Sequence, residues 1–191
     1  MTHSGHLNYA MIKTITLKQV LSIFMLFLFM SCDTLDELTK FDISFEESIT
    51  IPATSPIDLP FTISTPEIET NSNSEFSSND TAKDLVEEIK LTELKLTLKN
   101  PSSEDFSFLE TIEIYIAADD LPDTKLAWNP TPISNDSNVM FLDTSNEDLK
   151  AYIFKDSFYL KVKTGTDEVL TQDYDIDINT VFFVDAKILG L

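Results

Sequence analysis

The sequence predicts an all-β fold, an antiparallel immunoglobulin-like β-sandwich with one short inserted helix. Apolar and polar residues alternate with a period of two in many short segments after residue 40. Clusters of Asn, Asp, Ser and Pro separate these segments at short intervals. We expect about nine or ten strands, a number and spacing that favour a sandwich over a parallel sheet, with a closed barrel as the alternative.

The first predicted strands lie between residues 41 and 63. Phe41, Ile43 and Phe45 begin an alternation that ends at Pro52. A second strand is predicted over residues 57–63, at a sheet edge or a bulge, because Pro60 cannot donate a backbone hydrogen bond. Residues 64–79 are rich in Ser, Asn and Glu, and they predict a polar loop.

One short helix is predicted over residues 81–88. Asn79 or Asp80 can cap it, and its apolar residues lie near a common face. It leads into a strand over residues 89–98, and the dipeptide Asn100-Pro101 then turns the chain. Further strands are predicted over residues 112–116, 125–128, 139–142, 149–154, 158–163, 173–178 and 181–189.

The first 31 residues have the features of an export signal. Two lysines precede the apolar run Val20–Met30, and the pair Ser31-Cys32 follows it. The run is too short for a membrane span, which needs about 20 apolar residues. We therefore expect residues 1–31 to be cleaved, with translation starting at Met1 or Met11.

The cleavage region resembles the lipobox of bacterial lipoproteins. Residues 29–32 read FMSC, with a small residue before the cysteine and Phe29 where leucine is usual. The resemblance implies that Cys32 is diacylated and anchors the protein in the cell envelope, with the outer membrane as the expected location. One acyl chain holds a protein only marginally and two or more hold it firmly. The alternative is a free cysteine at the end of an ordinary secretory signal.

Two expectations complete the domain organisation. Residues 32–40 form an acidic tether, and residues 41–191 form the sandwich domain. The composition also resembles that of small envelope lipoproteins of Bacteroidota, since arginine is absent and lysine and asparagine are frequent.

The charge and the missing residue types exclude several functions. The net charge is −20, and every acidic residue follows the predicted cleavage site. Such a negative field repels nucleic acid and anionic lipid surfaces, although it also serves solubility alone. His3 and His6 both lie in the leader, so the mature chain has no histidine for a Ser-His-Asp triad or a zinc site. No cofactor is expected, and no catalytic or metal-binding residue is assigned.

Three acidic residues at alternate positions, Asp173, Asp175 and Asp177, resemble the start of an EF-hand loop. The glycine that such a loop requires is replaced by Ile178, and the closing glutamate is missing. Apolar residues alternate with the acids, so a half-buried strand is favoured over a calcium site.

Candidate binding residues lie between residues 115 and 128. Asp119, Asp120 and Asp123 surround a predicted turn, where they could bind a cation or simply be solvated. Trp128, the only tryptophan, could stack on a sugar, although closing the core is its commoner role. Tyr115 faces away from the neighbouring isoleucines and is a further surface candidate.

Residues 94–116 resemble the strand–Asn-Pro–strand core of the late-embryogenesis-abundant type 2 (water-stress) domain. That resemblance implies an antiparallel sandwich with a structural or interaction role.

We expect a noncatalytic, lipid-anchored binding or assembly module whose partner is an unidentified protein or glycan, and not an enzyme. The alternative is a carbohydrate- or calcium-binding surface module of a nutrient-uptake system, and an enzyme that uses only carboxylates ranks third. A sugar-binding module should expose two or three aromatic side chains in one plane.

Overall fold

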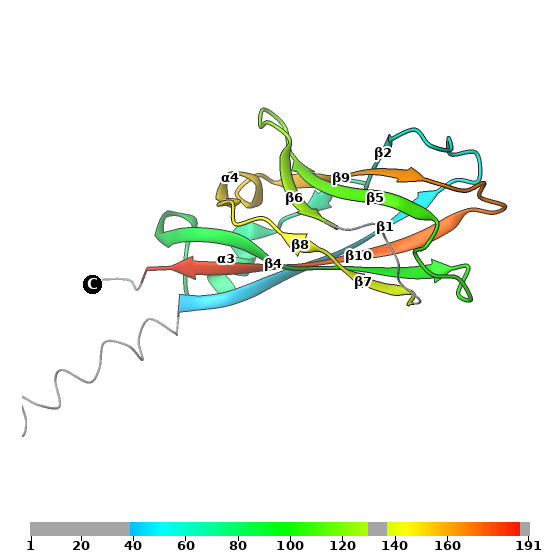
Figure 1. Ribbon diagram of the computed structural model, residues 1–191. Helices are drawn as coiled ribbons and strands as arrows, with labels where there is room; N and C mark the ends of the chain where they lie inside the picture. The colour runs from blue at the N-terminus through cyan, green and yellow to red at the C-terminus, as the bar shows by residue number, and fades with distance from the viewer. Residues whose placement is uncertain (1–38, 130–136, 188–191) are drawn as a thin grey trace, which may run out of the picture. The chain divides into compact units, whose positions relative to one another are not determined.

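Two antiparallel β-sheets stack on each other in the computed structural model, which describes residues 39–129 and 137–187 (Figure 1). The predicted all-β antiparallel sandwich is thereby confirmed. The leader, Cys32 and nearly all of the predicted tether lie outside the described residues. Within the described ranges, no helix is long and apolar enough to span a membrane.

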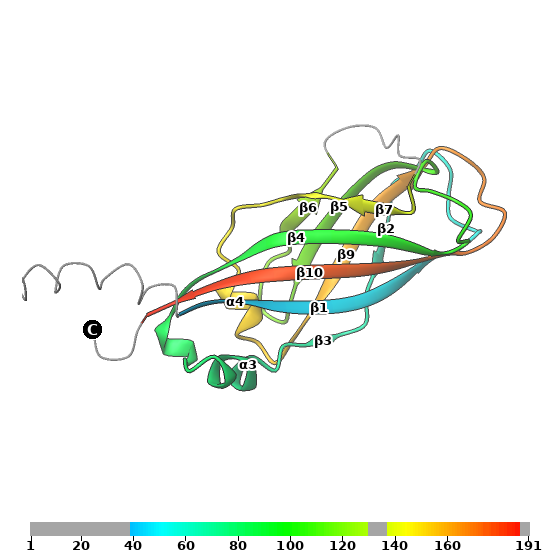
Figure 2. The same ribbon diagram turned by 90° about the horizontal axis from the view of Figure 1, so that it is seen from below.

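The first sheet, sheet A, has its longest strand in the interior (Figure 2). In order across the sheet, its strands are β1 (Lys40–Ile51), β10 (Tyr174–Ala186), β4 (Val86–Asn100) and β7 (Val139–Phe141). β10 pairs with β1 along the whole length of β1, and with β4 on its other side.

The second sheet, sheet B, forms the other layer of the sandwich. In order across it lie β2 (Phe61–Ser64), β9 (Ser157–Thr166), β5 (Leu109–Ala117), β6 (Thr124–Trp128) and β8 (Asp143–Thr144), while β3 (Ile68–Glu69) also pairs with β9. β5 therefore lies between β9 and β6, although β9 is distant from it in sequence.

The core fills the space between the inner faces of the two sheets. Ile112, Ile114 and Ile116 of β5 are buried, as their alternation predicts. Phe158 of sheet B meets Phe182 of sheet A edge to face, with ring centroids 6.1 Å apart. Burying one such side chain contributes about 1.5–3 kcal/mol to stability.

The predicted helix over residues 81–88 is wrong. The helix α3 (Ser72–Ser78) instead lies within the segment predicted as a loop, and Asn79 follows it as its C-cap. Only the 3₁₀ turn η2 (Lys83–Leu85) falls within the predicted helix, because β4 begins at Val86 and pairs with β10. The single buried aromatic ring of Phe76 holds α3 against the sandwich, which the sequence pattern does not reveal.

The predicted strand over residues 149–154 is also wrong, because this segment forms the short helix α4 (Lys150–Ile153). Leu149 and Ile153 are both fully buried. Residues four positions apart share one face of a helix but also one face of a strand, so the apolar pattern did not distinguish the two.

Two further predicted boundaries differ from the structure. The strands predicted over residues 173–178 and 181–189 form one strand, β10, of which the structure describes residues up to Ala186. Thr180 is buried inside this strand, and its hydroxyl donates a hydrogen bond to the Phe45 carbonyl at 3.3 Å. β2 begins only at Phe61, because Pro60 precedes it and Asp58 adopts a positive φ of 56°.

Candidate functional site

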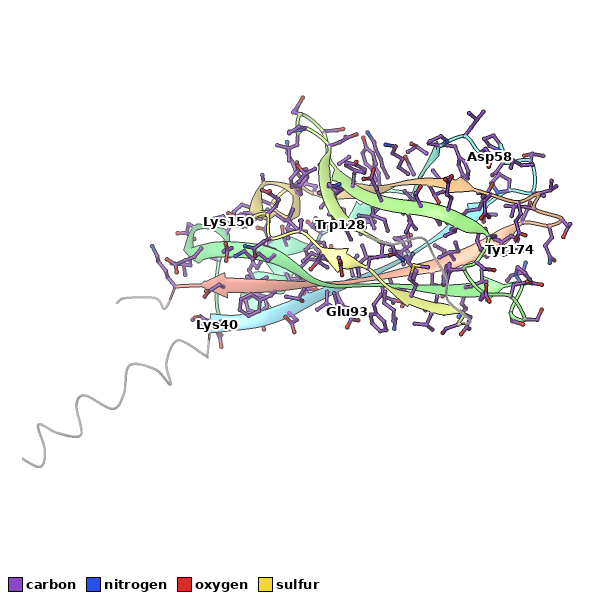
Figure 3. All side chains as sticks on the ribbon, viewed as in Figure 1. Lys40, Asp58, Glu93, Trp128, Lys150 and Tyr174 are labelled. Atoms are coloured by element: carbon purple, nitrogen blue, oxygen red, sulfur yellow. The ribbon has the colours of Figure 1, made fainter. Side chains whose placement is uncertain are left out.

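The candidate residues predicted from the sequence all lie on the hairpin formed by β5 and β6. Tyr115 is on β5, Trp128 is the last residue of β6, and the three aspartates lie between the two strands. Figure 3 shows Trp128 on sheet B, between the end of the sandwich marked by Lys150 and the end marked by Asp58 and Tyr174. The structure thus places Trp128 on the outer face of sheet B and not in the core.

Three half-buried aromatic residues, Trp128, Tyr115 and Tyr159, share this outer face. Trp128 pairs with Glu113, which is two residues before Tyr115 on β5. Tyr159 of β9 pairs with Ala117, which is two residues after Tyr115. The three aromatic side chains therefore step diagonally across β6, β5 and β9.

A bulge in β6 accounts for the position of Trp128. Leu126 and Ala127 are consecutive and both fully buried, and the β5–β6 register shifts at this point. Without the extra residue, Lys125 and Trp128 would face opposite sides, because side chains alternate along a regular strand. The bulge brings both side chains to the outer face.

Three lysines lie among the aromatic rings. Lys125 of β6 and Lys161 of β9 both pair with Tyr115, on opposite sides of β5. Lys163 pairs with Glu113 in the next row. We call this surface the aromatic–lysine face, and its members are Glu113, Tyr115, Lys125, Trp128, Tyr159, Lys161 and Lys163.

Glu113 contacts three polar side chains of this face. Its carboxylate accepts hydrogen bonds from Lys125 Nζ at 3.1 Å and from Tyr115 Oη at 2.9 Å, and Lys163 Nζ lies at 3.5 Å. The hydrogen bond from Lys125, followed by that from Tyr115, lowers the pKa of Glu113. The pKa of Tyr115 is raised, first by burial and then by its bond to Glu113. Glu113 is therefore held in its ionised form.

Two of the lysines also contact aromatic rings. Lys161 Nζ lies 5.4 Å from the centroid of the Tyr159 ring, and Lys125 Nζ lies 5.3 Å from that of Trp128. Lys161 also donates to both carboxylate oxygens of Asp123, at 2.9 and 2.7 Å, and this hydrogen bonding raises the pKa of Lys161. Each ammonium group is thus engaged with a carboxylate, an aromatic ring or both.

A pocket of about 290 Å³ opens beside Trp128. On β5 and β9 the pocket is lined by residues level with Trp128, such as Glu113 and Lys163, and by Thr111, which is further from Tyr115. Lys125 pairs with Tyr115 and so lies on the opposite side of Trp128 from Thr111. Trp128 is therefore bordered by Lys125 on one side and by the pocket on the other. The pocket is lined by Pro60, Thr111, Ile112, Glu113, Trp128, Asn129 and Lys163.

The three aspartates predicted as one cluster have separate surroundings. Asp123 belongs to the edge of the aromatic–lysine face through Lys161. Asp120 occupies a positive φ of 60° in the turn. Asp119 lines a different pocket, of about 360 Å³, together with Tyr159 and Asp156. Across the described ranges, no three acidic, histidine or cysteine side chains are grouped as a metal site.

The calcium-like stretch lies on the opposite sheet, where Asp175 and Asp177 belong to β10 and Asp173 directly precedes it. Thr50 donates to Asp175 and Ser48 donates to Asp177, each at 2.8 Å across the β1–β10 pairing. Asp173 accepts from the Ala53 backbone N–H at 2.8 Å. Each carboxylate thus bonds to its own partner, in agreement with the favoured strand interpretation.

Sequence reasoning missed Glu113, Tyr159 and the three lysines of the face. Tyr159, Lys161 and Lys163 occupy alternate positions, and this spacing indicates one exposed strand face. No pattern in the sequence shows that this strand lies beside β5, and the β6 bulge carries no glycine or proline signal.

No protein-family model matches the sequence, and the comparison with curated proteins finds no match.

Proposed function

We propose that this chain is a noncatalytic, lipid-anchored module of the cell envelope that binds a partner through the aromatic–lysine face. The observation that carries the proposal is the diagonal of Trp128, Tyr115 and Tyr159 across one outer sheet face. Tyrosine and tryptophan are enriched where proteins bind partners, because each combines a large apolar ring with a polar group.

The charge distribution supports this choice of face. The aromatic–lysine face has three lysines against three acids, which are Glu113, the neighbouring Asp123 and Asp143 of β8, the cross-strand partner of Trp128. The outer face of sheet A is more acidic, with Lys40, Lys90, Lys95 and Lys99 as its basic residues and Asp42, Glu46, Glu88, Glu93, Asp175, Asp177 and Asp185 as its acids. Of the two outer sheet faces of this strongly negative protein, the aromatic–lysine face therefore repels a negatively charged partner less.

The state of Glu113 supports a noncatalytic role. A general acid needs a raised pKa so that it carries a proton near neutral pH. Glu113, the carboxylate of the pocket beside Trp128, has its pKa shifted in the opposite direction. Its oxygens also accept hydrogen bonds from ammonium and hydroxyl donors, so it does not have the properties of a general acid.

Anchoring through Cys32 is tested by mass spectrometry of the protein isolated from membranes of its host. We expect the N-terminal peptide to begin at Cys32 and to carry the added mass of a diacylglycerol group. The variant Cys32→Ser should lose this modification and leave the membrane fraction. A wild-type peptide with an unmodified Cys32, or with the leader attached, would refute the anchor.

Binding is tested with the protein expressed in its host from the full-length gene. The protein is purified in detergent and titrated against envelopes from a host strain that lacks it. The double variant Trp128→Ala/Tyr159→Ala should bind about tenfold more weakly, as expected for loss of aromatic contacts at the centre of an interface. The control Phe141→Ala/Phe183→Ala also removes two rings, from the outer face of sheet A. It should bind like the wild type.

Circular dichroism and urea midpoints show whether each variant is folded. Equal losses of binding in both folded double variants, or no loss in the first, would contradict the assignment of the face. Tyr115→Phe offers a milder change, because it keeps the ring and removes only the hydroxyl that donates to Glu113.

A further inference from the structure

We infer that the partner of the aromatic–lysine face is an uncharged glycan, with one pyranose ring seated in the pocket beside Trp128. This inference rests on the proposed function, because it names the class of ligand that the same face would bind. It is supported by the composition of the pocket, by the charge of its polar groups and by the direction in which the aromatic side chains are arranged.

The pocket combines an aromatic plate with a polar rim. Trp128 and Pro60 supply apolar surface, whereas Glu113 and Lys163 supply an acceptor and a donor. The hydroxyl of Thr111 and the amide of Asn129 add groups that both donate and accept. A pyranose has the complementary form, since its C–H bonds present an apolar face and its hydroxyls surround the ring.

The size of the pocket suits a small unit of a larger ligand. Its volume of about 290 Å³ is just below the range of roughly 300–1,000 Å³ for small-molecule sites. One sugar ring is therefore a better match than a large cofactor. The rest of a glycan would lie on the open sheet outside the pocket.

The charges favour an uncharged glycan over an acidic one. Lys125 and Lys163 share the Glu113 carboxylate, and Lys161 is bonded to Asp123. With Asp143, which pairs with Trp128, the three lysines of the face are matched by three carboxylates, so a carboxylate on the ligand would meet no excess of positive charge. The net charge of −20 would also repel an acidic polymer during approach. Paired charges can nevertheless exchange hydrogen bonds with sugar hydroxyls.

The aromatic diagonal gives the glycan a direction across the sheet. Successive outward residues on a strand are about 7 Å apart, and neighbouring strands are about 4.8 Å apart. From Trp128 to Tyr115, and again from Tyr115 to Tyr159, the position changes by one outward residue along the strands and by one strand across the sheet. An extended oligosaccharide that leaves the pocket at Trp128 can therefore contact Tyr115 next, and it should bind more tightly than a single sugar.

Trp128 reports directly on binding because it is the only tryptophan in the sequence. The host-expressed protein, in a zwitterionic detergent without sugar groups, is titrated with uncharged hexasaccharides of glucose, mannose, galactose and xylose. Matching monosaccharides and a hexasaccharide of galacturonic acid form the comparison arms. We expect a saturable change in Trp128 emission with at least one uncharged hexasaccharide, and binding of its monosaccharide about tenfold or more weaker.

Calorimetry with the best hexasaccharide then tests the residues. Trp128→Ala should weaken binding about tenfold or more, whereas Trp128→Tyr, which retains an aromatic ring, should recover most of the loss. Glu113→Gln should also weaken binding, because it removes the charge that orders the lysines around the pocket. Phe141→Ala, an exposed ring on sheet A, should have no effect.

The glycan inference fails if no uncharged hexasaccharide gives a saturable signal, if the galacturonate oligomer binds best, or if Trp128→Ala binds as tightly as the wild type. If glycans fail while envelope binding still depends on Trp128 and Tyr159, the partner is of another class and the proposed function stands. If envelope binding is also insensitive to these residues, both proposals fail.

Discussion

At the residue scale, Glu113 determines how the side chains of the aromatic–lysine face are arranged. Its carboxylate holds Tyr115, Lys125 and Lys163 from three directions. Each contact is partly exposed to water, so each alone adds little to the stability of the fold. Together they hold the side chains of the face in one arrangement. A preordered surface loses less conformational entropy when it binds a ligand.

The pKa of Glu113 gives a prediction about acid stability. Because its folded-state pKa is lowered, ionised Glu113 stabilises the fold above the unfolded-state value of about 4.3, and this contribution is lost as the pH falls through the folded-state pKa. Glu113→Gln should therefore lower the free energy of unfolding at pH 7 by at most about 1 kcal/mol. Below pH 4 the difference from the wild type should shrink toward zero.

Urea denaturation at a series of pH values measures this difference. Glu93→Gln, which changes an outward glutamate on sheet A, is the matched control and should differ from the wild type by less than about 0.5 kcal/mol throughout. A Glu113→Gln difference that grows as the pH falls would contradict the assigned direction of the shift.

At the element scale, the sequence predicted the long strands and failed at the short irregular elements. Period-two alternation placed most of β1, β4, β5 and β9, because each has one face on the core. α3 was missed because a seven-residue helix with one central apolar residue has no helical periodicity. α4 was assigned as a strand because Leu149 and Ile153 fit either period. Tertiary packing decided both segments.

The position of α3 leads to a second prediction. Phe76 is fully buried, and its ring contacts those of Phe41 and Phe154 at centroid distances of 6.3 and 5.8 Å. Phe76→Ala should lower the free energy of unfolding by about 3–5 kcal/mol, because it leaves a cavity under the helix.

The control is Phe141→Ala, which removes the same ring from a side chain that is 61% exposed. Its urea midpoint should remain close to that of the wild type. If the two variants were equally stable, α3 would not be packed as described.

At the scale of the whole molecule, the proposed function depends on an uneven distribution of charge that the composition hides. The sequence has a net charge of −20, and a field of that sign repels other polyanions. It also placed Tyr115, Trp128 and Asp123 among the candidates. The segment with Tyr159, Lys161 and Lys163 could not be assigned to the same surface, because only the order of strands in sheet B brings β9 beside β5. Strand order is set by packing between distant segments, and local patterns do not encode it.

Lysine acetylation, followed residue by residue with mass spectrometry, tests the central claim most directly. The host-expressed protein is labelled alone and when bound to host envelopes, so that lysines on both sheets of the same molecule are compared. Lys125, Lys161 and Lys163 should react several-fold more slowly in the bound protein, whereas Lys90, Lys95 and Lys99 on sheet A should react at unchanged rates. Protection of the sheet A lysines with unchanged reactivity on sheet B would contradict binding through the aromatic–lysine face.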